Sequence, residues 1–213
     1  MDAVVGAVDN VKVDIFDTHR AWCMYANIFL EILSILLLLV AFAGNSEDWD
    51  EIKDGAWTVQ LNSKDKVVGY VGTRAYASKG SGHTVSMFED CDSSLCDDCK
   101  SAGESAIFCT VVGFIMVVVM LVLSFMRRTG EQKYYKFGAV VCGFFGLLFF
   151  ICAMGAWDDQ CVEEWPTSNG VKYEMGNGMN CVLTSFFFTL FGFVTHLCVS
   201  TSNNDKSPVV API

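Results

Sequence analysis

Four long apolar segments, separated by polar segments, dominate the pattern of this chain. They are Trp22–Gly44, Ala106–Met126, Phe137–Trp157 and Cys181–Ser200. About 20 apolar residues, each rising about 1.5 Å along a helix, suffice to cross the roughly 30 Å hydrocarbon core of a bilayer. The pattern therefore predicts a mainly α membrane protein with a four-helix transmembrane bundle, whose first span covers residues 21–44.

Polar residues fill the intervals 1–20, 45–105, 127–136, 158–180 and 201–213. The first interval holds four Asp and precedes an apolar segment longer than the roughly 7–15 residues of a signal-peptide core, so we expect the first span to be retained. Its apolar positions follow a helical period, which favours a helical run-in. The last interval is expected to be a disordered tail.

The interval 127–136 indicates the orientation. It carries four basic residues against Glu131, and short basic links between spans stay on the cytosolic side. We therefore expect a multi-pass protein of the plasma membrane with both termini in the cytosol. The intervals 45–105 and 158–180 then lie outside the cell. Their net charges of −6 and −4 account for the whole formal charge of −10.

Five cysteines fall in or at the edge of these two outer intervals, where an oxidising environment favours disulfides. They are Cys91, Cys96, Cys99, Cys161 and Cys181. A bridge between the last two would close a loop of about 20 residues and contribute about 3 kcal/mol. Of the first three, one must bond to the second outer interval, remain free or pair with another chain. Their thiolates with His83 form a less favoured zinc alternative.

Alternating residues in the first outer interval predict a small β-sheet braced by the cysteines. Ala56–Leu61, Val67–Ala77 and His83–Phe88 are strand candidates, and Asn62–Lys66 has the composition of a turn. The interval 158–180 can add one more strand. The predicted fold is thus a transmembrane bundle with a small disulfide-braced sheet in the first extracellular loop.

Glu31 is an acid inside the first apolar segment. A carboxylate near mid-membrane costs roughly 3 kcal/mol, so it should face the bundle interior, a cavity or a partner. It is either a proton or cation site or, as we favour, a carboxyl hydrogen-bonded near Ser34, Thr184, Ser185 or another subunit. We expect no second acid or base at its depth, and we place His196 at the cytosolic interface.

Small residues repeat at helical spacing in the third segment, at Gly138, Cys142 and Gly146. Such stripes allow helix backbones to approach closely. We expect them to pack within the bundle, with a helix of another subunit as the alternative. The chain has no catalytic triad, paired metal-ligating His or phosphate-binding Gly loop, so we expect no enzyme activity, metal or cofactor.

The acidic outer intervals also limit the expected partners. They should repel nucleic acid and favour cations or a basic partner. Four aspartates near the cysteines are candidates for a hard cation such as calcium, although we favour a solvated acidic surface. They are Asp90, Asp92, Asp97 and Asp98. The remaining expected partners are the lipid bilayer and other membrane-protein subunits or copies of the same chain.

The layout resembles the claudin/PMP22-type tetraspans, which have a large first outer loop with a lone Trp and a cysteine pair that braces a sheet. Trp57 (or Trp49) can match the Trp, and Cys91 with Cys96 or Cys99 the pair. Gly69–Arg74 stands where a Gly-Leu-Trp element is expected. The resemblance implies a junction-forming adhesion protein or an auxiliary subunit of a channel or other complex.

The leading hypothesis is a non-enzymatic auxiliary or structural subunit that docks laterally in a membrane complex. Claudin-like adhesion or barrier formation at cell junctions is the alternative. A large-pore junctional channel, suggested by cysteines in both outer intervals, is a further alternative.

Overall fold

The computed structural model describes most of the chain. The described residues are 4–5, 7–8, 19–79, 83–91, 93–129, 133–163 and 171–199. Most of the expected run-in 1–20, and the whole expected tail 201–213, lie outside them.

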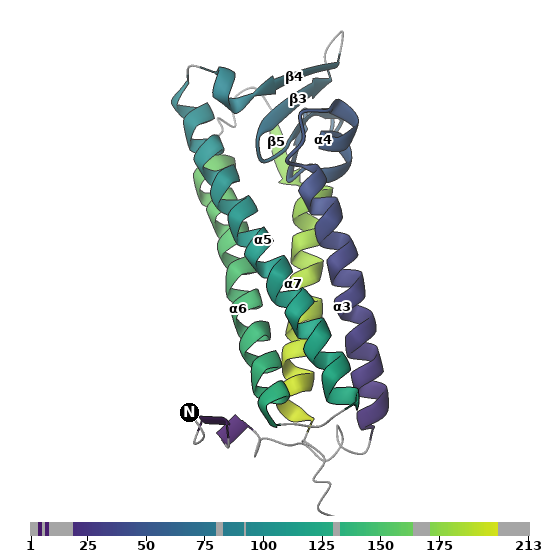
Figure 1. Ribbon diagram of the computed structural model, residues 1–213. Helices are drawn as coiled ribbons and strands as arrows, with labels where there is room; N and C mark the ends of the chain where they lie inside the picture. The colour runs from purple at the N-terminus through teal and green to yellow at the C-terminus, as the bar shows by residue number, and fades with distance from the viewer. Residues whose placement is uncertain are drawn as a thin grey trace, which may run out of the picture.

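Four helices are long and apolar enough to cross a membrane, as the hydrophobic pattern predicts. They are α3 (Arg20–Ala43), α5 (Ser94–Thr129), α6 (Lys133–Trp157) and α7 (Asn177–Cys198). The four helices run side by side as one bundle, in which α5 packs along α6 and α3 along α7 (Figure 1).

Helix α5 begins at Ser94, well before the apolar segment that starts at Ala106. Its polar first turns were expected to belong to the first loop. Every third or fourth position on one side of these turns is nevertheless buried, which extends the helix against the sheet. These positions are Cys96, Cys99, Ala102 and Ala106.

A five-stranded antiparallel sheet lies at one end of the bundle, in the order β4-β3-β2-β1-β5 (Figure 1). The strands are β1 (Thr58–Leu61), β2 (Val67–Val71), β3 (Ala75–Lys79), β4 (His83–Met87) and β5 (Lys172–Met175). The expected extra strand from 158–180 is confirmed as β5, which pairs with β1.

Two details of the sheet bear on the predicted strands. The expected strand Val67–Ala77 is in fact two strands, because the chain reverses at Gly72, whose N–H donates to Ala75 O at 2.9 Å. The expected turn Asn62–Lys66 is confirmed. The Asn62 side chain accepts from the backbone N–H groups of Lys64 and Lys66 there, as turn-forming Asn residues do.

The sheet is covered on both faces. Helix α4 (Trp49–Gly55) packs Ile52 against Ala75 and Ala77 on one face. Trp57, Val71 and Phe88 on the other side join the core of the long helices. We call α4, the five strands and the short helix η1 (Phe88–Asp90) the cap. The cap marks the sheet end of the bundle.

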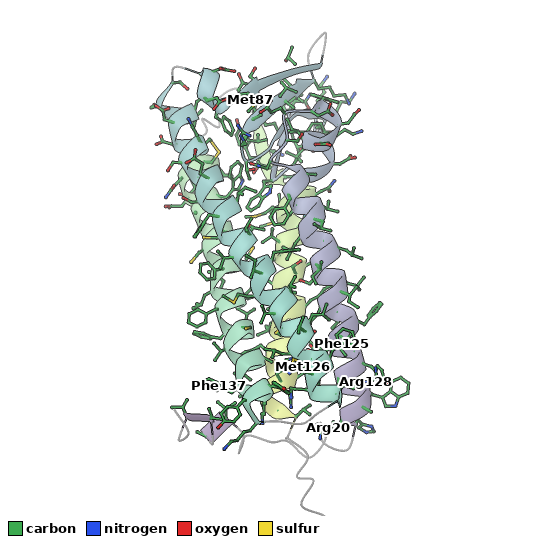
Figure 2. All side chains as sticks on the ribbon, viewed as in Figure 1. Arg20, Met87, Phe125, Met126, Arg128 and Phe137 are labelled. Carbon is green, nitrogen blue, oxygen red and sulfur yellow. A yellow bond between two sulfur atoms is a disulfide. The ribbon has the colours of Figure 1, made fainter. Side chains whose placement is uncertain are left out.

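The opposite end of the bundle is basic. Arg20 and Arg128 lie there, far from Met87 and the sheet (Figure 2). The Arg128 guanidinium stacks on the Tyr25 ring at 4.6 Å, a cation–π contact. We call this the basic end.

Candidate functional site

Trp57 joins the cap to the helices. Its side chain is fully buried, and its Nε1–H donates to the carbonyl oxygen of Ala41 in α3 at 3.2 Å. Its ring meets Trp157 of α6 edge to face at 5.8 Å, and Trp157 Nε1–H donates to Thr58 Oγ1 at 2.9 Å. Trp57, expected as a packing or partner residue, therefore packs inside this chain and is not exposed to a partner.

Backbone contacts fix the cap as closely as the aromatic rings do. The Thr73 N–H donates to Gly44 O at 2.9 Å, which joins the β2–β3 turn to the end of α3. On α5, Gly103 lies so near the Thr73 carbonyl oxygen that a Cβ there would collide with it. On α7, a Cβ at Gly178 would collide with the carbonyl oxygen of Gly55. The cap thus has no room to slide over the helices.

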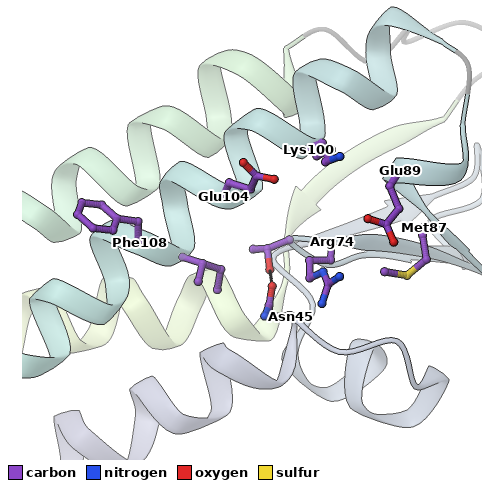
Figure 3. Close-up of a pocket in the computed structure, with 9 residues that line it drawn as sticks. Asn45, Arg74, Met87, Glu89, Lys100, Glu104 and Phe108 are labelled. Atoms are coloured by element: carbon purple, nitrogen blue, oxygen red, sulfur yellow. Dashed lines mark hydrogen bonds between the residues drawn. The ribbon is translucent and has the colours of Figure 1, made fainter.

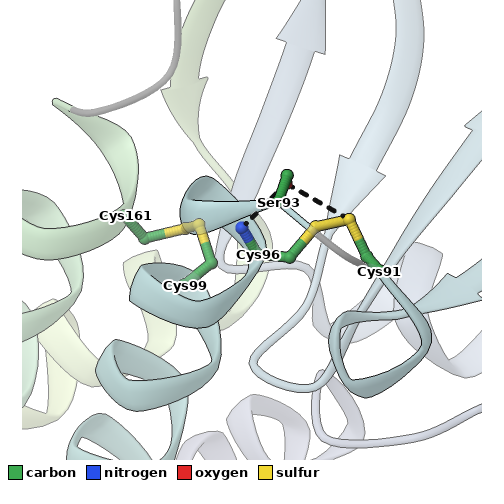
Figure 4. Close-up of a disulfide and its surroundings, with 5 residues drawn as sticks. All are labelled: Cys91, Ser93, Cys96, Cys99 and Cys161. Carbon is green, nitrogen blue, oxygen red and sulfur yellow. Dashed lines mark hydrogen bonds between the residues drawn. A yellow bond between two sulfur atoms is a disulfide. The ribbon is translucent and has the colours of Figure 1, made fainter.

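Two disulfides complete this junction: Cys91–Cys96 and Cys99–Cys161. The first closes a short loop beside Ser93, and the second joins α5 to η2 (Asp158–Val162), the π-helical turn that continues α6 (Figure 4). One cysteine of the first outer interval therefore does bond across to the second. Because all three thiols of the first interval are in disulfides, the zinc alternative is excluded.

The predicted Cys161–Cys181 bridge is wrong. Cys181 is a free thiol on α7, and Cys161 is already bonded to Cys99. The chain between Cys161 and Cys181 includes β5, which leaves the helix ends to pair with β1. Cys181 is thus the odd cysteine of the five.

A group of buried polar side chains lies inside the bundle toward the basic end. We call it the polar cluster; it consists of Asn27, Glu31, Ser124, Arg127 and His196 from α3, α5 and α7, all buried. Glu31 Oε1 accepts from Asn27 Nδ2 at 2.8 Å and from the Ser124 hydroxyl at 3.0 Å. Glu31 faces the bundle interior, as expected.

Two other expectations about Glu31 are wrong. Its hydrogen-bonding partners are not Ser34, Thr184 or Ser185, since the Ser185 hydroxyl donates to the carbonyl oxygen of Ser34 at 3.2 Å instead. Nor is Glu31 alone at its depth: His196 Nε2 lies 3.6 Å from Glu31 Oε1, with both side chains fully buried. His196 is therefore interior rather than interfacial, because side chains of α3 and α5 contact both nitrogens of its ring.

Arg127 is a hydrogen-bond partner of the His196 ring. Its Nη1 lies 2.7 Å from His196 Nδ1. A guanidinium only donates, so Nδ1 accepts from Arg127. Nε2 lies 2.9 Å from the Ser124 hydroxyl, which in turn reaches Glu31. Arg127 also donates from Nη2 to Val199 O at 3.0 Å, at the end of α7.

The polar cluster is a buried hydrogen-bonded network. It runs from Arg127 through His196 and Ser124 to Glu31 and ties α3, α5 and α7 together. Among the described residues, Asn27 Oδ1 and Glu31 Oε2 have no hydrogen-bond partner. Lys136 of α6 is also fully buried. Because polar groups are costly inside an apolar bundle, the hydrogen bonds that the cluster does form favour this packing of the helices.

The small residues of α6 also lie inside the bundle. A Cβ at Gly138 would lie 3.1 Å from Leu123 Cδ1 of α5, and one at Gly146 would lie 3.5 Å from Thr189 Cγ2 of α7. Both glycines therefore serve packing within this chain, as we favoured. Cys142 is a half-buried free thiol.

Sequence reasoning missed four members of the polar cluster: Asn27, Ser124, Arg127 and His196. One signal was available, because Asn27 and Glu31 are four residues apart and share a helix face. Arg127 was assigned to the basic link, and its burial depends on how far α5 continues beyond the apolar segment.

Neither a scan against models of protein families nor a search of curated proteins found a match.

Proposed function

We propose that this is a multi-pass membrane protein, non-enzymatic, that docks laterally as an auxiliary or structural subunit of a larger membrane complex such as a channel. Each of the four long helices exposes at least one large apolar side chain by half or more: Phe29, Ile115, Ile151 and Phe187. Such surfaces are unfavourable in water and suit lipid. In this placement the sheet end is extracellular and the basic end cytosolic, in agreement with the positive-inside rule.

The observation that carries the proposal is the way in which the cap is fixed to the bundle. Trp57 joins the cap to α3 and α6, and the close contacts at Gly103 and Gly178 join it to α5 and α7. Beside the cap, the Cys99–Cys161 disulfide links α5 to η2. Cap and helices therefore form one rigid body. A partner that contacts both the cap and the membrane face is held in one geometry, as an auxiliary subunit requires.

Charge favours a different protein as the partner over a second copy. The outer intervals that form the cap and its surroundings carry the whole net charge of −10. Two identical acidic caps that face each other repel, whereas a basic partner surface is attracted. We therefore propose a heteromeric complex with a partner whose outer surface is basic.

Purification of the tagged full chain from its native membrane in mild detergent tests this proposal. We expect a second membrane protein to copurify in fixed ratio and to dissociate as ionic strength rises. The exposed acids of α4 allow a sharper test: Glu51→Gln with Asp54→Asn should weaken the complex. Lys53→Gln on the same helix is the matched control and should leave the complex intact. Recovery of a lone monomer would overturn the proposal.

Claudin-like adhesion is the second candidate, and the sheet supports it. Among the described residues, β4 is an edge strand whose outer side has no neighbour in the sheet, and such edges can pair with another chain. The Cys91–Cys96 disulfide does not brace the strands as the claudin/PMP22 resemblance implies, because it joins the end of η1 to α5. Expression in non-adherent cells should then produce contacts enriched in the protein, and a diffuse distribution would count against adhesion.

A further inference from the structure

A groove of about 280 Å³ opens on the side of the molecule, where the cap meets α5 (Figure 3). One wall is α5, which contributes Lys100, Glu104 and Phe108. The other wall is the cap, which contributes Arg74 from the β2–β3 turn and Glu89 from η1. The groove is separate from the polar cluster and from both disulfides.

The α5 wall changes from apolar to charged along its length. Phe108, Glu104 and Lys100 succeed one another at intervals of four residues, so they lie on one helix face, about 6 Å apart along the axis. Phe108 is 65% exposed and belongs to the apolar segment that begins at Ala106. In the proposed membrane placement, this puts Phe108 in the hydrocarbon and Lys100 above it, among the lipid headgroups.

The charges of the two walls alternate in sign. Figure 3 shows Phe108 at one end of the groove, Glu89 at the other, and Arg74 with Lys100 between them. Arg74 Nη1 forms an ion pair with Glu47 Oε1 at 3.7 Å, and the two side chains are 46% and 65% exposed. Such an exposed pair is weak, so the guanidinium remains available to an anion.

This arrangement selects among possible ligands by charge. An anionic headgroup would meet two cations but also the carboxylates of Glu89 and Glu104. Free phosphate would make no use of the apolar end at Phe108. A ligand that carries a phosphate, an ammonium group and an apolar chain matches the two cations, the carboxylate of Glu89 and the apolar end at Phe108.

We propose that the groove binds one zwitterionic glycerophospholipid. Arg74 and Lys100 hold its phosphate by charge-assisted hydrogen bonds, and Glu89 faces its choline or ethanolamine nitrogen. One acyl chain runs along Ile107 and Phe108. The site rests on the proposed membrane placement but not on the proposed partner subunit.

Native mass spectrometry of the full chain in detergent tests the site. The probes are dioleoyl phosphatidylcholine and dioleoyl phosphatidylglycerol, added separately. The wild type should hold one phosphatidylcholine more tightly than phosphatidylglycerol. Arg74→Ala with Lys100→Ala should weaken phosphatidylcholine binding roughly tenfold. Lys64→Ala with Lys66→Ala removes the same charge from the exposed β1–β2 turn and should leave binding unchanged.

The carboxylates supply a test of opposite sign. Glu89→Gln with Glu104→Gln leaves two uncompensated cations, so the preference should shift toward phosphatidylglycerol. A thermal unfolding midpoint close to that of the wild type shows that each variant is folded.

Unchanged phosphatidylcholine affinity in the Arg74/Lys100 variant overturns the proposal, and so does equal wild-type affinity for the two lipids. A photoreactive residue at position 108 that captures a protein segment instead of lipid overturns it too. A chain that stays soluble and monomeric without detergent contradicts the membrane placement itself. This result distinguishes failure of the membrane placement from failure of the lipid site alone.

Discussion

The two ends of the helix bundle are held together in different ways. At the sheet end, the Cys99–Cys161 disulfide joins α5 to η2 beside the cap, and close contacts between backbones, as at Gly103 against Thr73, hold the cap on the helices. At the basic end, the helices are joined by hydrogen bonds between side chains, with Arg127 and His196 at the centre. One end depends on covalent bonds and shape, and the other on buried hydrogen bonds between side chains.

The difference follows from the surroundings of each end. In the proposed placement the sheet end borders water and an oxidising compartment, where disulfides persist and exposed polar groups are hydrated. The polar cluster is enclosed by apolar helices, where a polar side chain has only other side chains and backbone carbonyls as partners. The sheet end should therefore be sensitive to reduction, and the basic end to the loss of single polar side chains.

Removal of the Cys99–Cys161 disulfide should have the largest effect. Its cysteines are 62 residues apart, and the chain-entropy estimate for such a loop is about 4 kcal/mol. The Cys91–Cys96 bridge spans a separation of 5 and should contribute about 2 kcal/mol. Titration with SDS from mild detergent, followed by Trp fluorescence, should rank the two Cys→Ala double variants in that order. Equal losses would mean that the long-range bridge between α5 and η2 stabilises the sheet end no more than the short one.

Replacement of Arg127 tests the other end. Arg127→Met removes the donor to His196 and to Val199 O and leaves both acceptors buried, so we expect a loss of about 3 kcal/mol. Arg128→Met next to it removes only an exposed contact with Tyr25 and should change the free energy of unfolding much less. Reducing agent should leave the difference in free energy of unfolding between the two variants unchanged. If the two variants were equally stable, the basic end would not depend on this network.

Much of the sheet end could be predicted from sequence, because its signals are local. Apolar length marks the four helices, alternation marks β1 and β4, and the composition of 62–66 marks a turn. Cysteine pairing was not predictable, since connectivity depends on the distances between folded segments. The extension of α5 was hidden because its first turns are polar, although Cys96, Cys99 and Ala102 follow a helical period.

The polar cluster was harder to predict because its side chains meet only if they lie at the same height along the bundle. Counting from the ends of apolar segments placed Glu31 and His196 at different levels. The long helices have 24, 36, 25 and 22 residues, so equal counts from their ends do not reach equal heights. Only the packed bundle shows that Glu31, Ser124 and His196 meet.

Substitution at Gly103 tests the close contact between α5 and the cap. Gly103→Ala places a methyl group against the Thr73 carbonyl oxygen and should cost about 2 kcal/mol by overpacking. Gly155→Ala in α6 is the matched control, because a Cβ there meets nothing within 4 Å. It should be neutral or slightly stabilising, since Ala is the better helix former. Similar behaviour of the two variants in the SDS titration would contradict a tight contact between α5 and the cap.

Ser124 offers the finest test of the network. Ser124→Ala removes one of the two side chains that contact both His196 and Glu31, and Asn27 remains as the other. The expected cost is about 1 kcal/mol. Thr110→Val on the same helix removes a hydroxyl that bonds only locally, to Ala106 O, and should cost less. The decisive quantity is the coupling to Glu31→Gln in a double-mutant cycle. A network predicts a coupling of about 0.5 kcal/mol or more for Ser124 and none for Thr110. Additivity at Ser124 would mean that its hydroxyl fills space at the basic end without linking the helices.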